Sequence, residues 1–229
     1  FCAQCATDAD CKGANQACEN YACASLESPT LLINELDYEM DGFDGDEYVE
    51  LYNYSDATID PAQMTNAYLY FIDYPFGGGA VSVITSTIAL ADLLEAPLPA
   101  GGYAVVANSN VIASLPDGTP SLIMPPNSLD NGVFGASAVA LVIGAPSSSL
   151  KTVLDGVHYE GTIAVVEGLG AWSPEADPAP TDTGAKSLSR CPNGGDTNNN
   201  GADFTDTSTL TPGAANSCST GGTTPGGPK

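Results

Sequence analysis

The chain has 229 residues, of which 43% are hydrophobic, enough for one sizeable domain with a packed core. Acidic residues number 28 against five basic ones, so the formal net charge is −23. This charge disfavours nucleic-acid phosphates and anionic membrane surfaces as partners, because the sequence holds no basic patch to meet them. The sequence also contains no apolar run long enough for direct membrane insertion.

The first 27 residues form a polar, cysteine-rich head. Five of the seven cysteines of the chain lie here, and they are Cys2, Cys5, Cys11, Cys18 and Cys23. Such density predicts a small disulfide-bonded extension in an oxidising compartment. A zinc site is one alternative, but it needs four thiolate or imidazole ligands and the chain has a single histidine, His158. A redox-active Cys2–Cys5 pair is the other alternative.

Residues 28–218 have the pattern of an all-β body. Apolar or alternating stretches, most of them divided by Gly, Pro, Asn or Asp, occur at 30–38, 46–54, 67–74, 80–90, 101–109, 137–144 and 152–161. One short helix is expected at 89–96. Many short strands without strand–helix alternation predict an antiparallel sandwich or barrel. Residues 219–229 are rich in Gly, Thr and Pro, and are expected to be a tail or linker.

Four stretches of this body resemble, in the same order, the lamin tail domain of the type found in secreted bacterial proteins. They are LLINELDYEMDGFDGDEYVELYNYSDATID, LPAGGYAVVANS, SAVALVIGAPSSSLKTVLDGVHYEG and KSLSRCPNGGDTNNNGADFTDTSTLTPGAAN. The resemblance implies an immunoglobulin-like antiparallel β-sandwich that serves as a binding or structural module, with no chemistry of its own. Extra length between residues 62 and 136, and Cys191 directly after Arg190, depart from the family pattern. The head resembles small cysteine repeats that contain a T-D-x-D-C stretch.

The stretch DTNNNGADF, at 196–204, is a candidate calcium loop. Its candidate ligands are Asp196, Asn198, Asn200 and Asp203. Oxygens at alternate positions followed by glycine are typical of the first half of such a loop, although Thr207 stands where a complete loop has glutamate. The alternative is a turn that merely favours Asp and Asn.

A second acidic stretch, DYEMDGFDGDE at 37–47, is another candidate calcium site. Its candidate ligands are Asp37, Asp41, Asp44 and Asp46. Closely spaced carboxylates repel one another unless a cation or solvent screens them, so the alternative is a solvated hairpin loop. Glu35 and Glu50 lie on the flanking strands, where they could face each other or contact Arg190. We expect a structural ion pair for Arg190, the only arginine of the chain.

The cysteines suggest how the chain is cross-linked. Cys191 and Cys218 flank the closing stretch, far in sequence from the head, and are predicted to form a disulfide. The remaining pairs are expected within the head, among Cys5, Cys11, Cys18 and Cys23. Cys2 is then left for a cysteine upstream of this sequence or for a neighbouring subunit.

The sequence favours a non-catalytic protein, because it has no G-x-S-x-G motif and no phosphate-cradling glycine motif. We expect an extracellular or cell-surface structural or adhesive module, such as the subunit of an extracellular assembly or filament, that is stabilised by calcium. Its expected partners are other copies of itself or cell-surface components. The alternative is a targeting or binding module of a larger secreted enzyme, such as a nuclease or phosphatase.

Overall fold

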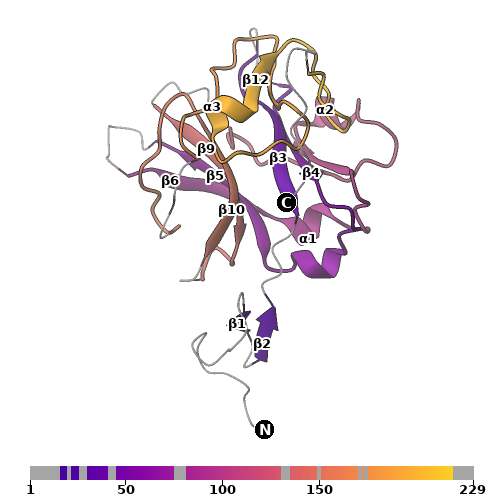
Figure 1. The fold of residues 1–229 in the computed structure, drawn as a ribbon, viewed down its shortest axis with the longest axis vertical. Coiled ribbons are helices and arrows are strands. Elements are labelled where there is room, and N and C mark those ends of the chain that lie inside the picture. The colour runs from indigo at the N-terminus through magenta and orange to yellow at the C-terminus, as the bar shows by residue number, and fades with distance from the viewer. Residues whose placement is uncertain are drawn as a thin grey trace.

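The computed structural model describes residues 16–19, 22–25, 30–40, 45–74, 81–129, 135–148, 151–169, 172 and 175–218 (Figure 1). The strands are β1 (Gln16–Glu19), β2 (Ala22–Ser25), β3 (Leu31–Asp37), β4 (Tyr48–Asn53), β5 (Ala67–Asp73), β6 (Val83–Ala89), β7 (Tyr103–Ala107), β8 (Ser121–Ile123), β9 (Ser137–Ile143), β10 (Thr152–Tyr159), β11 (Ser187–Arg190) and β12 (Phe204–Thr207). The helices are the 3-10 turn η2 (Pro61–Met64), α1 (Leu90–Leu93), α2 (Ser109–Ile112) and α3 (Asn200–Asp203).

Two sheets make up the body of the described chain. The larger has six strands in the order β12-β11-β3-β4-β7-β8, and the smaller has four in the order β10-β9-β5-β6. Every neighbouring pair is antiparallel except β7 and β8, which run parallel. The expected all-β sandwich is thereby confirmed. The closing strands β11 and β12 lie beside β3, the first strand of the body, so the two ends of the sandwich meet in one sheet.

The hydrophobic core lies between the two sheets. Strand residues alternate in direction, so each strand contributes every second side chain to the interior. The larger sheet contributes Ile33, Leu51 and Leu188, among others, while the smaller sheet contributes Leu69, Phe71, Val139 and Leu141. All seven of these residues are fully buried.

A β-bulge in β3 decides which face its polar residues occupy. Ile33 pairs with Leu51 and Glu35 pairs with Glu50, so Asn34 is one extra residue on β3. The insertion keeps Leu36 on the core face with Ile33, and it turns Asn34 and Glu35 toward the outer face of the larger sheet. Polar side chains thus come to lie on an outer face that is itself buried.

Both outer faces are covered by other parts of the chain. Four residues pack against the outer face of the smaller sheet around Tyr70 and Ala140, and they are Ile163, Val166, Leu169 and Trp172. Val111 of α2 packs against Tyr48 on the outer face of the larger sheet. Residues 193–195 and 211–216 cover the rest of that face through hydrogen bonds, which form the site described below.

The seven predicted strand segments and the predicted helix are all present, the helix as the single turn α1. The sequence did not predict β8, β11 or β12, which have only three or four residues each. The head contributes the hairpin of β1 and β2, in which Cys18 and Cys23 are directly opposed partners. Cys2, Cys5, Cys11 and the predicted tail lie outside the described residues. Among the described helices, none is long and apolar enough to cross a bilayer.

Candidate functional site

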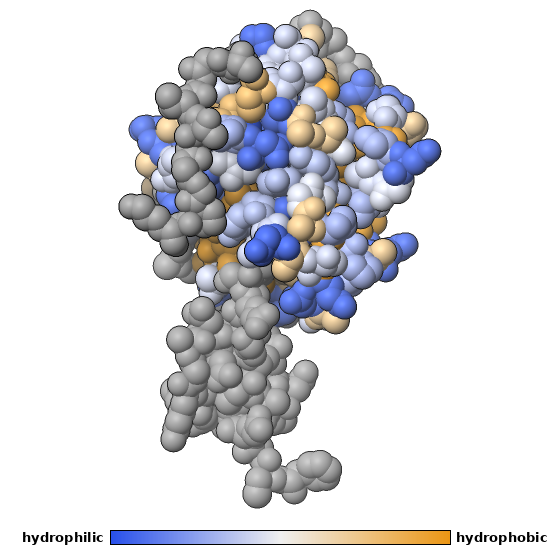
Figure 2. Space-filling model, turned by 45° about the vertical axis from the view of Figure 1, so that its right-hand side comes forward, coloured by the Kyte–Doolittle hydropathy of each residue, from blue (hydrophilic) through white to orange (hydrophobic). Residues whose placement is uncertain are grey.

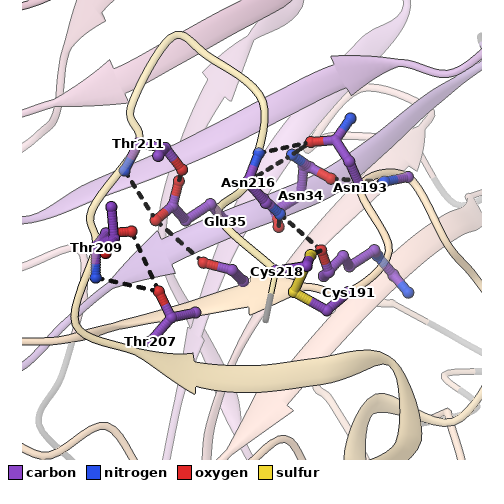
Figure 3. Close-up of a disulfide and its surroundings, with 12 residues drawn as sticks. Asn34, Glu35, Cys191, Asn193, Thr207, Thr209, Thr211, Asn216 and Cys218 are labelled. Carbon is purple, nitrogen blue, oxygen red and sulfur yellow. Dashed lines mark hydrogen bonds between the residues drawn. A yellow bond between two sulfur atoms is a disulfide. The ribbon is translucent and has the colours of Figure 1, made fainter. Parts of the chain in front are cut away.

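The segment that follows β11 is fastened to the larger sheet by a disulfide. Cys191 and Cys218 are bonded, with 5.5 Å between their Cα atoms, which confirms the predicted pair. The side-chain amide of Asn216, two residues before Cys218, donates to the backbone carbonyls of Asn34, at 3.0 Å, and of Arg190, at 2.8 Å (Figure 3). The end of the body is therefore held both to β3 and to β11.

Glu35 is the centre of the first group of contacts. Its Oε1 accepts hydrogen bonds from the hydroxyls of Ser187, at 2.5 Å, and Ser189, at 3.1 Å. Thr211 donates its hydroxyl to Oε2 at 2.7 Å and its backbone N–H to Oε1 at 3.2 Å. Glu35 is fully buried, so these donors replace the water that its carboxylate loses on folding.

Glu50 lies opposite Glu35 and takes a second set of donors. The side-chain amide of Asn34 reaches its Oε1 at 2.8 Å, and the backbone N–H of Gly213 reaches its Oε2 at 2.7 Å. The site thus brings the two glutamates together as cross-strand partners. Burial raises the pKa of Glu50 to about 8, against the opposing effect of these two donors.

Asn34, the residue inserted by the bulge, joins the loops that cover this face. Its Oδ1 accepts from the backbone N–H of Gly194 at 2.9 Å, and its amide also contacts the Oδ1 atoms of Asn193 and Asn216. The first and the last of the four stretches quoted above therefore meet in one contact, through residues 33–35 (INE) and 211–216 (TPGAAN). Asn34 and Glu35 supply the sheet side, and Thr211, Gly213 and Asn216 supply the loop side.

Arg190 forms a second buried group between the two sheets. Its guanidinium donates to Asp155 Oδ1 at 2.8 Å, Asp203 Oδ2 at 3.2 Å and Asp196 Oδ1 at 3.4 Å, and it lies 3.8 Å from Glu175 Oε2. The Arg190 side chain is fully buried. The expected structural ion pair of Arg190 is therefore present, but its partners are not Glu35 or Glu50.

The backbone of β3 helps to hold this ion pair. The pairing of β11 with β3 involves Leu36 and Glu35 of β3 and does not extend to Ile33. The N–H of Ile33 instead donates to Asp155 Oδ2 at 2.6 Å, and its carbonyl accepts from Arg190 Nε at 2.9 Å. The N–H and carbonyl of Ile33, which β11 leaves unpaired, thus bond to charged side chains. The ion pair of Arg190 and Asp155 links β3, β10 and β11.

Four carboxyl groups around one guanidinium leave excess negative charge. Burial and the neighbouring charge of Asp155 raise the pKa of Glu175 to about 9. Asp155 accepts three N–H donors, from Ile33, Gly156 and Arg190. Burial raises the pKa of Asp155 as well, but Arg190 and the N–H of Ile33 act against that effect, so Glu175 is the more readily protonated member of the pair.

The loop of 196–203 has two of its predicted ligands in this group. One carboxylate oxygen from each of Glu175, Asp196 and Asp203 lies within 4.8 Å of the others, a spacing that could hold a metal ion. The guanidinium of Arg190 contacts the same three residues. The calcium prediction for this loop stays a prediction, and the described contacts assign its carboxylates to Arg190.

Of the other two predicted ligands of this loop, Asn200 donates to Glu175 Oε2 at 2.7 Å and also bonds β10, whereas Asn198 lies at the surface. Asn200 is buried, accepts from the backbone N–H of His158 at 2.9 Å and donates to the carbonyl of Gly156 at 3.1 Å. Asn198 is exposed, and its backbone N–H donates to Asp196 Oδ1 at 3.0 Å. Its φ of 57° is the left-handed conformation that the alternative interpretation, an Asx-favouring turn, requires.

The second acidic stretch is only partly described. Asp46 is exposed and accepts from the side chain of Asn110 at 3.0 Å. Asp37 is buried, and its carboxyl group lies beside that of Asp182. Asp41 and Asp44 lie outside the described residues, so their predicted role in calcium binding stays a prediction.

Sequence reasoning missed several members of these groups. Asp155 and Glu175 lie 35 and 15 residues before Arg190 and carry no motif that joins them to it, and nothing in the sequence joins Asp182 to Asp37. The only available signal was Asp155 itself, an acidic residue within the apolar alternation of 152–159. Comparisons with models of known families, with curated proteins and with solved structures found no match.

Proposed function

We propose that this chain is an extracellular structural or adhesive module, and that its partners are other copies of itself or cell-surface components. The observation that carries the proposal is the use of the buried polar residues. Glu35, Glu50, Asp155 and Arg190 all bond to other parts of the same chain. These bonds hold the segment that follows β11 against the two sheets, as expected of a stable structural module.

The only histidine of the chain supports a structural role in the same way. His158 is fully buried in β10. Its ring nitrogens lie 3.1 Å from the carbonyl oxygen of Gly161 and 3.3 Å from that of Glu175. A general base must reach the proton that it abstracts from a substrate, and a histidine enclosed in this way is not placed to do so.

The surface and the disulfide support the extracellular part of the proposal. The Cys191–Cys218 bond is typical of proteins from oxidising compartments. Hydrophilic residues cover much of the face seen in Figure 2, with hydrophobic residues in small separate groups. The large negative charge favours a soluble surface and, as partners, cations or surfaces with positive charge.

Light scattering over a wide range of protein concentration tests the proposal. We expect the molar mass to exceed that of the 23.2 kDa monomer and to grow with concentration. A Cys2→Ser variant separates covalent from non-covalent assembly, because an odd number of cysteines cannot all pair within one chain. Binding of the labelled protein to intact cells tests the adhesive role.

A strict monomer that also fails to bind cells would contradict the proposal. A monomer that binds one purified secreted enzyme in its place would favour the alternative, a targeting or binding module.

A further inference from the structure

Asp37 and Asp182 form a buried acidic pair that neither of the groups described above includes. Asp37 is the last residue of β3 and is 1% exposed, while Asp182 lies in the segment before β11 and is 3% exposed. Their carboxyl groups are within hydrogen-bonding reach of each other. The sequence separates them by 145 positions, which is 182 minus 37, so only the fold brings them together.

The contacts of this pair are incomplete. Asp182 Oδ2 accepts from the backbone N–H of Tyr38 at 3.4 Å, and the backbone of Glu39 hydrogen-bonds both carboxyl groups. The Oδ1 atoms of Asp37 and Asp182, however, are buried and accept from no N–H or hydroxyl group. A buried carboxylate oxygen without a donor destabilises the folded state, so a group that meets both oxygens would stabilise the fold.

The surrounding charges do not supply that group. Glu35 and Asp206 lie close enough to act on the pair, and both are acidic. Lys186 bonds Asp206 Oδ2 at 2.6 Å, while Asp206 Oδ1 is a third buried oxygen that meets no N–H or hydroxyl donor. Among the described residues, every ion pair involves Arg190 or Lys186, and none includes Asp37 or Asp182.

We propose that Asp37 and Asp182 together hold a divalent cation that prefers oxygen ligands, with calcium as the expected species. Calcium accepts carboxylate, carbonyl and water oxygens in a flexible geometry, whereas magnesium demands a near-ideal octahedron. Two protein carboxylates make a weak site, in the range of extracellular calcium modules. The site joins Asp182 to Asp37 alone and excludes the cluster around Arg190. The proposed calcium site does not depend on the structural or adhesive role proposed above.

The test is the thermal unfolding of the whole chain in calcium and in chelator at neutral pH. Free calcium at ten times its dissociation constant should raise the Tm of the wild type by about 3–6 °C. Asp182→Asn should lose this shift, because the variant keeps the size of the side chain but offers one carboxylate fewer. In chelator the variant should be at least as stable as the wild type, since its amide can donate to Asp37.

Two matched variants control for charge and for the other acidic cluster. Asp117→Asn removes one exposed charge that does not belong to the Asp37–Asp182 pair and should keep the full calcium shift. Asp196→Asn should also keep it, because Asp196 belongs to the Arg190 group. If Asp182→Asn does not unfold cooperatively, Asp37→Asn takes its place. Titration calorimetry then measures calcium binding, which this variant should lose.

Three results would overturn the proposal. Equal Tm values of the wild type in calcium and chelator would mean that the pair holds only a shared proton. A shift that survives in Asp182→Asn would place the ion elsewhere. A shift lost in Asp196→Asn alone would assign the ion to the loop at 196–203.

Discussion

Replacing Arg190 by methionine should destabilise the protein severely. The substitution keeps an apolar chain of similar length over Phe204, whose ring centre lies 4.7 Å from the guanidinium carbon. It removes the positive charge from a group of four carboxyl residues, of which Asp155 is fully buried. The loss therefore comes from charge and hydrogen bonding more than from packing.

The size of the effect follows from the contacts. Removing one partner of a buried ion pair costs about 3–5 kcal/mol, because the remaining charge stays buried without compensation. Arg190 also donates to the carbonyls of Ile33 and Gly195, so we expect the upper part of that range. Domains of this kind have about 5–15 kcal/mol of total stability, so the variant should lose a large part of it.

Urea unfolding at neutral pH measures this loss as a lower midpoint with an unchanged slope. Lys186→Met is the matched control, because it breaks the partly exposed ion pair with Asp206 and should cost at most about 1 kcal/mol. The double variant Arg190→Met with Asp155→Leu should recover part of the loss, since an apolar pair can replace a buried ion pair. The penalty of Arg190→Met should also shrink as the pH falls and the carboxylates become protonated.

A loss in Arg190→Met no larger than that in Lys186→Met would refute this reasoning. So would a double variant less stable than Arg190→Met alone, because the stranded charge of Asp155 would then not be the source of the penalty.

Three further predictions concern the closing segment. Replacing Cys191 and Cys218 by serine should lower the free energy of unfolding by about 3.5 kcal/mol, measured in urea, because the bond spans 27 residues. The pKa of Glu50 is raised from 4.5 to about 8, so the folded state holds a proton that the unfolded state releases between these values. The free energy of unfolding should therefore fall as the pH rises across this window, by up to about 1.4 kcal/mol per pH unit. Urea unfolding at several pH values should show a weaker dependence of this free energy on pH for Glu50→Gln. Gly213→Ala should cost more than about 1 kcal/mol, since its φ is +82° and an added Cβ would lie 2.9 Å from a proline ring. The control Gly118→Ala, at φ +84° with open space around it, should cost less when both variants are unfolded in urea. Equal costs would contradict the steric argument.

The sequence by itself determined the strands of the body and one of its cross-links. Segments such as 67–74 and 137–144 alternate or run apolar over enough residues to predict strands locally. Cys191 and Cys218 could be paired because the closing stretch lies between them. The short strands β11 and β12 escaped prediction because four residues contain too little periodicity, and their pairing with β3 stabilises them instead.

Only the tertiary structure decided what the charged residues do. The sequence placed Asp196 and Asp203 in a calcium-like spacing, but the order of strands brings Arg190 of β11 against Asp155 of β10 and into reach of both. The sequence likewise grouped Asp37 with the acids that follow it, whereas the fold sets it beside Asp182. Charge interactions depend on distance and burial, and both are set by contacts between residues far apart in the chain, which local spacing does not encode.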